Sequence, residues 1–246
     1  MVFLRSLIYF ILMVATTILY SILLFSIGFI LPFAISSRIA NSWGWVNLQL
    51  LKWICGLDYR LHGTEHIPEG SCIILSKHQS AWETIAFRHL LPPLQTWVLK
   101  RELMRIPLFG WALAAMQPIA IDRKAGKKAA KQIIEKGIHF LQQGRNVIIF
   151  PEGTRVTPGQ RKKYGVGGAL LAKRSGHPVL PVAHNAGVFW RRRALEKYPG
   201  TIHVVFGPVI ETDGLTAAAI NRQVEEWIES TVERLPRTTQ EVYQEP

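Results

Sequence analysis

The stretch that decides the fold is SCIILSKHQSAWE, which occupies residues 71–83. Its first half contains Cys72–Ser76, a short apolar run of the kind that predicts a buried strand. Its second half is polar and leads into a helix expected over Ser80–Leu90. Open α/β sheets bind their ligands at the carboxyl ends of strands, just before the following helix. We therefore expect an α/β domain with a ligand site at this turn.

Apolar runs on both sides of this stretch predict the rest of the sheet. Further strands are expected at Tyr59–His62, Thr96–Leu99, Pro118–Ile121, Asn146–Phe150, Val179–Ala183 and Ile202–Phe206. Further helices are expected at Lys124–Gln143, Gly167–Arg174 and Leu215–Leu235. Strands that alternate with helices predict an α/β fold, with helices flanking a largely parallel mixed sheet. The domain is expected to cover residues 58–235, followed by a polar tail over 236–246.

Residues 1–57 predict a membrane-anchoring helical segment. No charged residue and no His occurs from Ser6 to Ser37, and a helix needs only about 20 apolar residues to span a hydrocarbon core. Pro32 is expected to end or kink this helix. A second apolar stretch, Ile39–Leu57, carries Trp43, Trp45 and Trp53 and favours an interfacial helix. A buried helical hairpin is the alternative, although so long an uncharged run is rare in soluble folds.

The chain is strongly basic, with 29 Lys and Arg against 17 Asp and Glu and a net charge of +12. Such an excess predicts an anionic partner, which could be nucleic acid, anionic lipid or a phosphorylated substrate. The apolar N-terminus and the lack of a nucleic-acid-binding motif argue against nucleic acid. Cations that follow the apolar run place the body on the cytoplasmic side of a membrane. Cys55 and Cys72 fit that reducing compartment, and no disulfide or cysteine-based metal site is expected.

His78 and Glu83 form the first candidate site. Their spacing does not stack them on one continuous helix, but they can meet if His78 lies in the turn and Glu83 in the first helical turn. The carboxylate would then fix the imidazole tautomer and leave the other ring nitrogen to accept a proton from a hydroxyl. The same residues also fit a capping box, with Ser80 as N-cap and Glu83 bonding back to its amide. The residues by themselves leave both interpretations open.

Two further strand ends carry polar clusters. Residues 150–155 read FPEGTR, in which Gly153 permits a positive φ and Thr154 and Arg155 suit a phosphate. Arg123 ends the run Ile-Ala-Ile-Asp-Arg, and Lys100 follows another predicted strand. Since ligands gather at the carboxyl ends of parallel strands, we expect these three cations to converge on one anion.

These motifs, taken in order, resemble the four motifs of glycerolipid acyltransferases, specifically the 1-acyl-sn-glycerol-3-phosphate acyltransferases. They are His-x4-acid at 78–83, Ile-Asp-Arg ending at Arg123, Phe-Pro-Glu-Gly-Thr-Arg at 150–155 and Val-Leu-Pro-Val at 179–182. The resemblance covers about residues 63–207. It implies transfer of a fatty acyl group from an acyl-CoA or acyl-carrier-protein thioester to the sn-2 hydroxyl of a lysophosphatidic acid, giving phosphatidic acid without a cofactor.

The resemblance also implies roles for single residues. His78 matches the general base and Glu83 its acidic partner. Positions for the acceptor and its phosphate match Lys100, Arg123, Glu152, Gly153, Thr154 and Arg155. The family usually has Asp where this chain has Glu83, and Asn where it has Lys77. The longer Glu side chain requires the contact with His78 to relax, or else Glu83 mainly caps the helix.

Other functions remain as alternatives. The acceptor could be another lysolipid, such as a lyso-ornithine lipid, or the chain could be a non-catalytic lipid-binding protein of the membrane surface. The basic segment Arg191–Arg193 fits anionic lipid, a solvated patch or a dock for an acidic carrier protein. No G-x-S-x-G elbow is present, so an acyl-enzyme is not expected. His62 and His66 suggest a metal pair, but Gly63 predicts a turn there and no third ligand is apparent, so no metal is expected.

Overall fold

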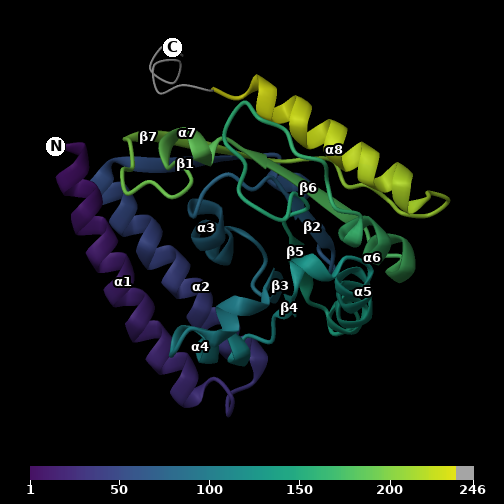
Figure 1. Ribbon diagram of the computed structural model, residues 1–246, viewed down its shortest axis with the longest axis horizontal. Helices are drawn as coiled ribbons and strands as arrows, with labels where there is room; N and C mark the ends of the chain where they lie inside the picture. Colours follow the sequence, from purple (N-terminus) through teal and green to yellow (C-terminus); the bar gives the residue numbers. More distant parts are fainter. Residues whose placement is uncertain (237–246) are drawn as a thin grey trace.

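A computed structural model describes residues 1–236 as a sheet with a layer of helices on each face (Figure 1). The order of strands and helices confirms the predicted α/β class. Apart from Pro236, the predicted polar tail over 236–246 lies outside the described residues.

The sheet has seven strands, in the order β1-β7-β6-β2-β5-β3-β4. They are β1 (Leu57–His62), β2 (Ile73–Ser76), β3 (Gln95–Lys100), β4 (Ile119–Ile121), β5 (Asn146–Ile149), β6 (Val179–His184) and β7 (Gly200–Phe206). All seven expected strands are present among the described residues, with ends that lie within two residues of the expected ones. Only the β6–β7 pair is antiparallel, so the sheet is largely parallel and mixed, as predicted.

The central strand β2 shows how the two faces of the sheet are filled. Ile74 faces one cluster of buried side chains, whereas Ile73 and Leu75 face the other, because successive side chains of a strand point to opposite faces. All three are fully buried. A strand buried on both faces reads as a continuous apolar run, which explains why no alternation marked this one in the sequence.

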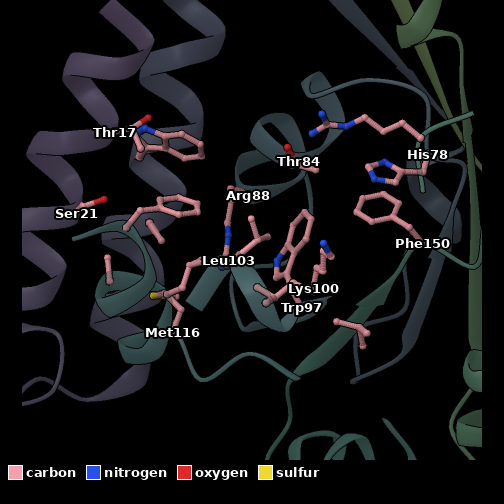
Figure 2. A pocket seen from close by; sticks show the side chains of 18 of the residues that line it. Thr17, Ser21, His78, Thr84, Arg88, Trp97, Lys100, Leu103, Met116 and Phe150 are labelled. Carbon is pink, nitrogen blue, oxygen red and sulfur yellow. The ribbon is translucent and has the colours of Figure 1, made fainter. Parts of the chain in front are cut away.

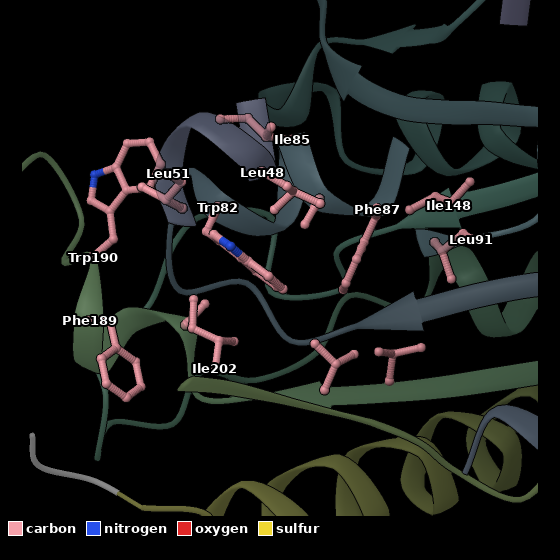
Figure 3. Close-up of a cluster of buried hydrophobic side chains, with 14 of the residues drawn as sticks. Leu48, Leu51, Trp82, Ile85, Phe87, Leu91, Ile148, Phe189, Trp190 and Ile202 are labelled. Atoms are coloured by element: carbon pink, nitrogen blue, oxygen red, sulfur yellow. The ribbon is translucent and has the colours of Figure 1, made fainter. Parts of the chain in front are cut away.

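Helices of the N-terminal half cover one face, and helices of the C-terminal half cover the other. The first group is α1 (Val2–Ile27), α2 (Phe33–Leu50), α3 (Trp82–Leu90) and α4 (Phe109–Ala115), and short α7 (Ala186–Phe189) joins it. Their aromatic and aliphatic side chains pack over the sheet, as Figure 3 shows for Trp82, Phe87 and Phe189. The second group is α5 (Lys127–Gln142), α6 (Gly167–Ser175) and α8 (Ala217–Arg234). The sequence did not predict α4 or α7.

The uncharged N-terminal run forms a helix and the start of a second one. α1 ends at Ile27, ahead of Pro32, and Pro32 stands at the N-cap of α2. Proline suits the start of a helix because it lacks the amide hydrogen that a helix interior requires. Within residues 1–236, α1 is the one helix long and apolar enough to cross a membrane, and most of its apolar side chains are exposed. This exposed apolar surface indicates association with a membrane.

The second apolar stretch is a continuous helix that belongs to the domain's packing. α2 continues into a π-helical turn over Leu51–Cys55, and it packs against α1 and α3. Trp45 and Trp53 are exposed on it, as expected for an interfacial helix, whereas Trp43 turns inward and lines a cavity. The interfacial and buried interpretations therefore each describe one side of the same helix.

Candidate active site

His78 lies in the turn after β2, with Glu83 in the first turn of α3. Its Nδ1 lies 2.8 Å from Oε1 of Glu83, and its ring stacks on Phe150 with centroids 4.1 Å apart. The imidazole is 7% exposed and lines a cavity. Since Nδ1 is occupied by a carboxylate, it carries the proton, and Nε2 is the basic nitrogen. Nε2 makes no hydrogen bond within the described residues, so it is available to a substrate hydroxyl.

Glu83 combines both functions that the sequence left open. Its Oε1 also accepts hydrogen bonds from the amides of Gln79 and Ser80, each at 2.7 Å. Ser80 is not the N-cap, because α3 begins at Trp82, although its Oγ accepts from the Trp82 amide. Burial alone would raise the pKa of Glu83, but the contact with His78 and the hydrogen bond from the Ser80 amide hold this pKa below its ordinary value. Glu83 is therefore an anion that both orders the turn and orients the imidazole.

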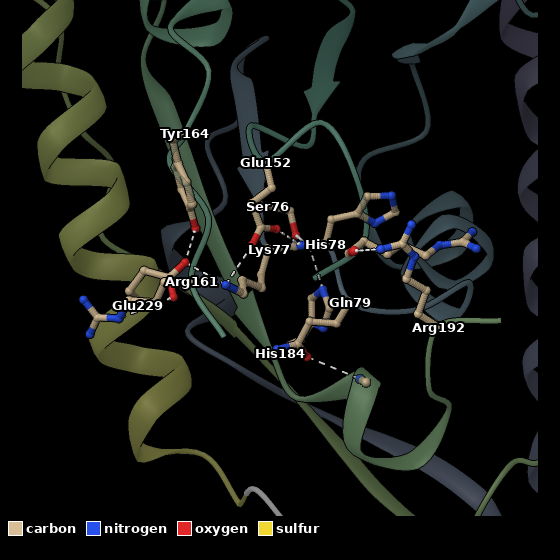
Figure 4. A network of polar contacts seen from close by, with 12 residues as sticks. Ser76, Lys77, His78, Gln79, Glu152, Arg161, Tyr164, His184, Arg192 and Glu229 are labelled. Carbon is tan, nitrogen blue, oxygen red and sulfur yellow. Dashed lines mark hydrogen bonds and ion pairs between the residues drawn. The ribbon is translucent and has the colours of Figure 1, made fainter. Parts of the chain in front are cut away.

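A buried network behind the turn fixes the backbone of His78 (Figure 4). Its amide donates to Oε2 of Glu152 over 2.7 Å. The ammonium of Lys77 contacts carboxylate oxygens of Glu152 at 2.8 Å and of Glu229, on α8, at 2.7 Å. The Tyr164 hydroxyl donates to the same Glu229 oxygen over 2.9 Å. Burial raises the pKa of Glu152 to about 7, against the opposing effects of Lys77 and the His78 amide.

His184, at the end of β6, contacts the turn that carries His78. It is fully buried, and its Nδ1 accepts from the Ala186 amide, so its Nε2 must donate to the carbonyl of Lys77 over 2.8 Å. Burial lowers the pKa of His184 despite the nearby charge of Glu83. His184 is accordingly a neutral residue that holds the Lys77 carbonyl, immediately before His78, in place.

A cavity of about 500 Å³ joins His78 to a group of cations (Figure 2). Lys100 ends β3, Arg123 follows β4 and Arg155 follows β5, and all three line the cavity. The expected convergence at one sheet edge is therefore present. Burial lowers the pKa of Arg123 and of Arg155, and in each case a neighbouring guanidinium lowers it further. Cations held this close together favour an anion between them.

Of the other predicted binding residues, some line the cavity and some lie behind its wall. Thr154 lines the cavity, whereas Glu152 and Gly153 are not among its lining residues in the described part of the chain. Gly153 has φ 66°, the left-handed conformation that its position required, and its carbonyl accepts a hydrogen bond from the guanidinium of Arg123. Glu152 is 2% exposed and faces the network behind His78.

Most amides around the site already have partners. The amides of His78, Gln79 and Ser80 bond the two glutamates, and the Gly153 amide donates to the Phe150 carbonyl. The amides of Gln79 and Ser80 are therefore already used by Glu83 and are not free to stabilise an oxyanion. The Thr154 amide donates no hydrogen bond within residues 1–236, and Thr154 is one of the residues that line the cavity.

Nothing in the described residues gathers three or more His, Cys, Asp or Glu side chains around a possible metal ion. The two histidines that suggested a metal pair go to separate partners. His62 stacks on His203 with a ring nitrogen contact of 3.1 Å, and Nδ1 of His66 contacts the Phe206 carbonyl at 3.0 Å.

Several side chains of the site escaped the sequence analysis. Arg192 and Arg193, for which the sequence suggested anionic lipid, solvent or an acidic carrier protein, line the cavity, and Arg192 donates to the Arg155 carbonyl over 3.0 Å. His184 stands at a strand end, so the rule that identified Lys100 could have identified it. Arg88 carried no such signal, because its place on a helix does not reveal what its face contacts.

Comparison with known proteins places these features in a family. The family model described as Acyltransferase matches residues 58–185. A 1-acyl-sn-glycerol-3-phosphate acyltransferase of Pseudomonas aeruginosa is 43% identical over 242 residues, which cover 97% of this chain and 94% of the relative. One from Cocos nucifera is 28% identical over 92% of this chain and 73% of its own length. The crystal structure of the 1-acyl-sn-glycerophosphate acyltransferase from Thermotoga maritima superposes with a TM-score of 0.76 at 21% identity, covering 94% of each chain, and shares the fold.

Proposed function

Since this chain belongs to the Acyltransferase family, we propose that it transfers a fatty acyl group from an acyl thioester to the sn-2 hydroxyl of 1-acyl-sn-glycerol 3-phosphate. The product is phosphatidic acid. The names of the bacterial and plant relatives support this acceptor.

One observation carries the proposal. An imidazole whose Nδ1 is held by Glu83 presents its Nε2 to a cavity that also contains the guanidinium of Arg155. A base at one point and cations at another are what a substrate with a hydroxyl near a phosphate requires. Arg155, Arg123 and Lys100 bind the phosphate, and this places the hydroxyl at His78.

The reaction proceeds by direct transfer. The hydroxyl oxygen attacks the thioester carbonyl carbon while its proton passes to Nε2 of His78, and Glu83 stabilises the resulting imidazolium. The tetrahedral intermediate collapses as the carbon–sulfur bond breaks, and the imidazolium returns the proton to the leaving thiolate. The Thr154 amide and the guanidinium of Arg155 are the donors best placed for the transient oxyanion.

The far end of the cavity suits a hydrocarbon chain. Apolar side chains of α1, α2 and α4 line it, among them Leu24, Ala40, Leu113 and Met116. A cavity with one apolar end and one cationic end fits a substrate with a fatty tail and an anionic head group.

The strand order divides the cations of the cavity into two groups, which come from the two sides of β2 and meet where Arg192 contacts Arg155. Lys100, Arg123 and Arg155 follow β3, β4 and β5, which lie on one side of β2 in the sheet, whereas Arg192 and Arg193 follow β6 and α7 on the other side. The acceptor carries one phosphate, and acyl-CoA and acyl-carrier protein both carry phosphate on the pantetheine arm. We assign the first group to the acceptor and the second to the donor.

The exposed apolar side chains of α1 support a membrane-bound enzyme, and the cations that follow α1 in the sequence favour a catalytic domain on the cytoplasmic side. Flotation with liposomes and protease protection in inside-out vesicles test this placement. A catalytic domain that is protected in inside-out vesicles and digested in intact cells would contradict it.

The activity itself is tested with purified protein, labelled acyl-CoA and 1-acylglycerol 3-phosphate. We expect labelled phosphatidic acid from the wild type, loss of product in His78→Ala, and a raised KM for the acceptor in Arg155→Ala. Arg101→Ala is the matched control, because Arg101 is exposed and pairs with Asp122 outside the cavity. Free fatty acid formed without acceptor would identify a hydrolase, and product from lyso-ornithine lipid only would change the acceptor. If cells that carry His78→Ala keep the wild-type phenotype, the chain is a non-catalytic lipid-binding protein.

A further inference from the structure

Arg88 lies in the substrate cavity, although no motif marks it. It stands on the last turn of α3, is 8% exposed and lines the cavity. In Figure 2 its side chain lies between His78 and Phe150 on one side and Ser21 and Met116 on the other. It therefore stands where the cationic end of the cavity meets the apolar end.

The guanidinium of Arg88 has no hydrogen-bond acceptor among the described residues. No hydrogen bond or carboxylate contact of its side chain occurs there, and its Nη1 is buried without a partner. Within residues 1–236 the guanidinium lies over the ring of Trp97, whose centroid is 5.1 Å from the guanidinium carbon. Burial lowers the pKa of Arg88 to about 10, so the side chain remains charged at neutral pH.

Other buried cations of the described chain differ in this respect. Lys77 contacts two carboxylates, Lys197 donates to the Leu195 carbonyl, and Arg145 donates to the side-chain oxygen of Gln117 over 2.8 Å. Since an unmet donor on a buried charged group is costly, a partner for Arg88 is expected from outside the chain. The cavity is the space from which that partner can come.

We propose that Arg88 is a subsite for the carbonyl oxygen at the head of the fatty-acyl chain that occupies the apolar end of the cavity. The proposal rests on the proposed function, because it assumes an acylated substrate. A phosphate is the less suitable ligand here, because Lys100, Arg123 and Arg155 already offer it a group of cations in the same cavity. A carbonyl oxygen is the acceptor found where a hydrocarbon chain meets a head group. The carbonyl can belong to the ester of the acceptor or to the thioester of the donor.

Pairs of ligands with and without the carbonyl test the subsite. For the acceptor, 1-acylglycerol 3-phosphate is compared with its 1-O-alkyl ether. For the donor, an unreactive 2-oxoalkyl-CoA is compared with an S-alkyl-CoA of the same length. Binding is read from the rise in unfolding temperature of the wild type and of Arg88→Met, so the result does not depend on turnover.

In one pair, we expect the wild type to bind the ligand with the carbonyl at least about tenfold more tightly than the ligand without it, as a hydrogen bond from a charged group implies. Arg88→Met should lose that preference while binding the other member as the wild type does, and Arg88→Lys should keep part of it. The pair that responds identifies the source of the carbonyl. Arg145→Met is the matched control and should keep the preference, since Arg145 is buried but outside the cavity.

Two outcomes would overturn the subsite. One is a wild type that binds both members of both pairs equally. The other is an Arg88→Met variant that weakens all four ligands equally or leaves every preference intact. If the wild type binds these ligands but forms no phosphatidic acid, the proposed function fails while the subsite stands.

Discussion

Replacement of Lys77 by Met tests the buried network that holds His78. Lys77 is 1% exposed and contacts Glu152 and Glu229, which are themselves 2% and 5% exposed. Lys77→Met keeps the volume but removes the buried cation between the two carboxylates, while the exposed Arg161 remains 4.0 Å from Glu229. Removal of one partner from a buried ion pair costs about 3–5 kcal/mol. For a chain of this size, that corresponds to an unfolding temperature lower by about 10 °C.

The loss of stability in Lys77→Met should depend on pH, and the raised pKa of Glu152 sets the direction of that dependence. Burial raises the pKa of Glu152 to about 7 although Lys77 opposes this rise. A carboxyl with a raised pKa in the folded state binds more protons there than in the unfolded state, so stability falls as the pH rises through this window. Without Lys77 the ionised form loses its main support. The deficit of Lys77→Met should therefore be larger at about pH 8 than at about pH 5, where Glu152 is protonated.

Thermal unfolding in detergent, followed by circular dichroism at both pH values, measures these effects. Lys131→Met is the matched control, because Lys131 forms an exposed pair with Glu135, and its unfolding temperature should change by less than about 3 °C. Adding Glu229→Gln to Lys77→Met removes one unpaired carboxylate and should recover part of the loss. A Lys77→Met protein as stable as the control variant, or a deficit equal at both pH values, would refute the reasoning.

Two further predictions concern the reaction. Glu83→Gln should lower kcat by about 10²-fold or more with a small effect on the KM of either substrate, because a neutral amide cannot stabilise the imidazolium of His78. Steady-state kinetics measure this effect. An unchanged kcat would remove Glu83 from the mechanism. The double variant Arg192→Ala with Arg193→Ala should raise the KM for acyl-CoA or acyl-carrier protein about tenfold, leave the KM for the lysolipid unchanged and spare acyl-pantetheine, which lacks phosphate. Arg191→Ala is the control, because Arg191 lies in the same loop but does not line the cavity. A raised lysolipid KM instead would assign Arg192 and Arg193 to the acceptor.

Much of this protein could be predicted from residues that are close in sequence. The run Ile73-Ile74-Leu75 was recognised as a strand because a backbone buried on both faces needs apolar side chains at every position. Lys100, Arg123 and Arg155 were placed together because parallel strands bring their carboxyl ends to one edge of the sheet. These predictions depend on local geometry, so they did not require the order of the strands.

Contacts between distant segments depended on the tertiary structure. Glu229 lies 152 residues from Lys77, and the periodicity of α8 gives no sign that one of its glutamates reaches a buried lysine. Whether Glu83 caps a helix or orients His78 could not be decided either, because the choice depends on where the chain turns before Trp82.

The amino-acid sequence by itself determined the α/β class, the apolar α1 and the edge of the sheet at which the polar side chains gather, since each follows from the chemistry of neighbouring residues. Only the tertiary structure decided the strand order, the antiparallel β7, the carboxylates around Lys77 and the place of Arg88 in the cavity. The physical reason is that hydrogen-bond geometry and burial act along the chain over a few residues, whereas the pairing of distant side chains is set by how whole layers pack.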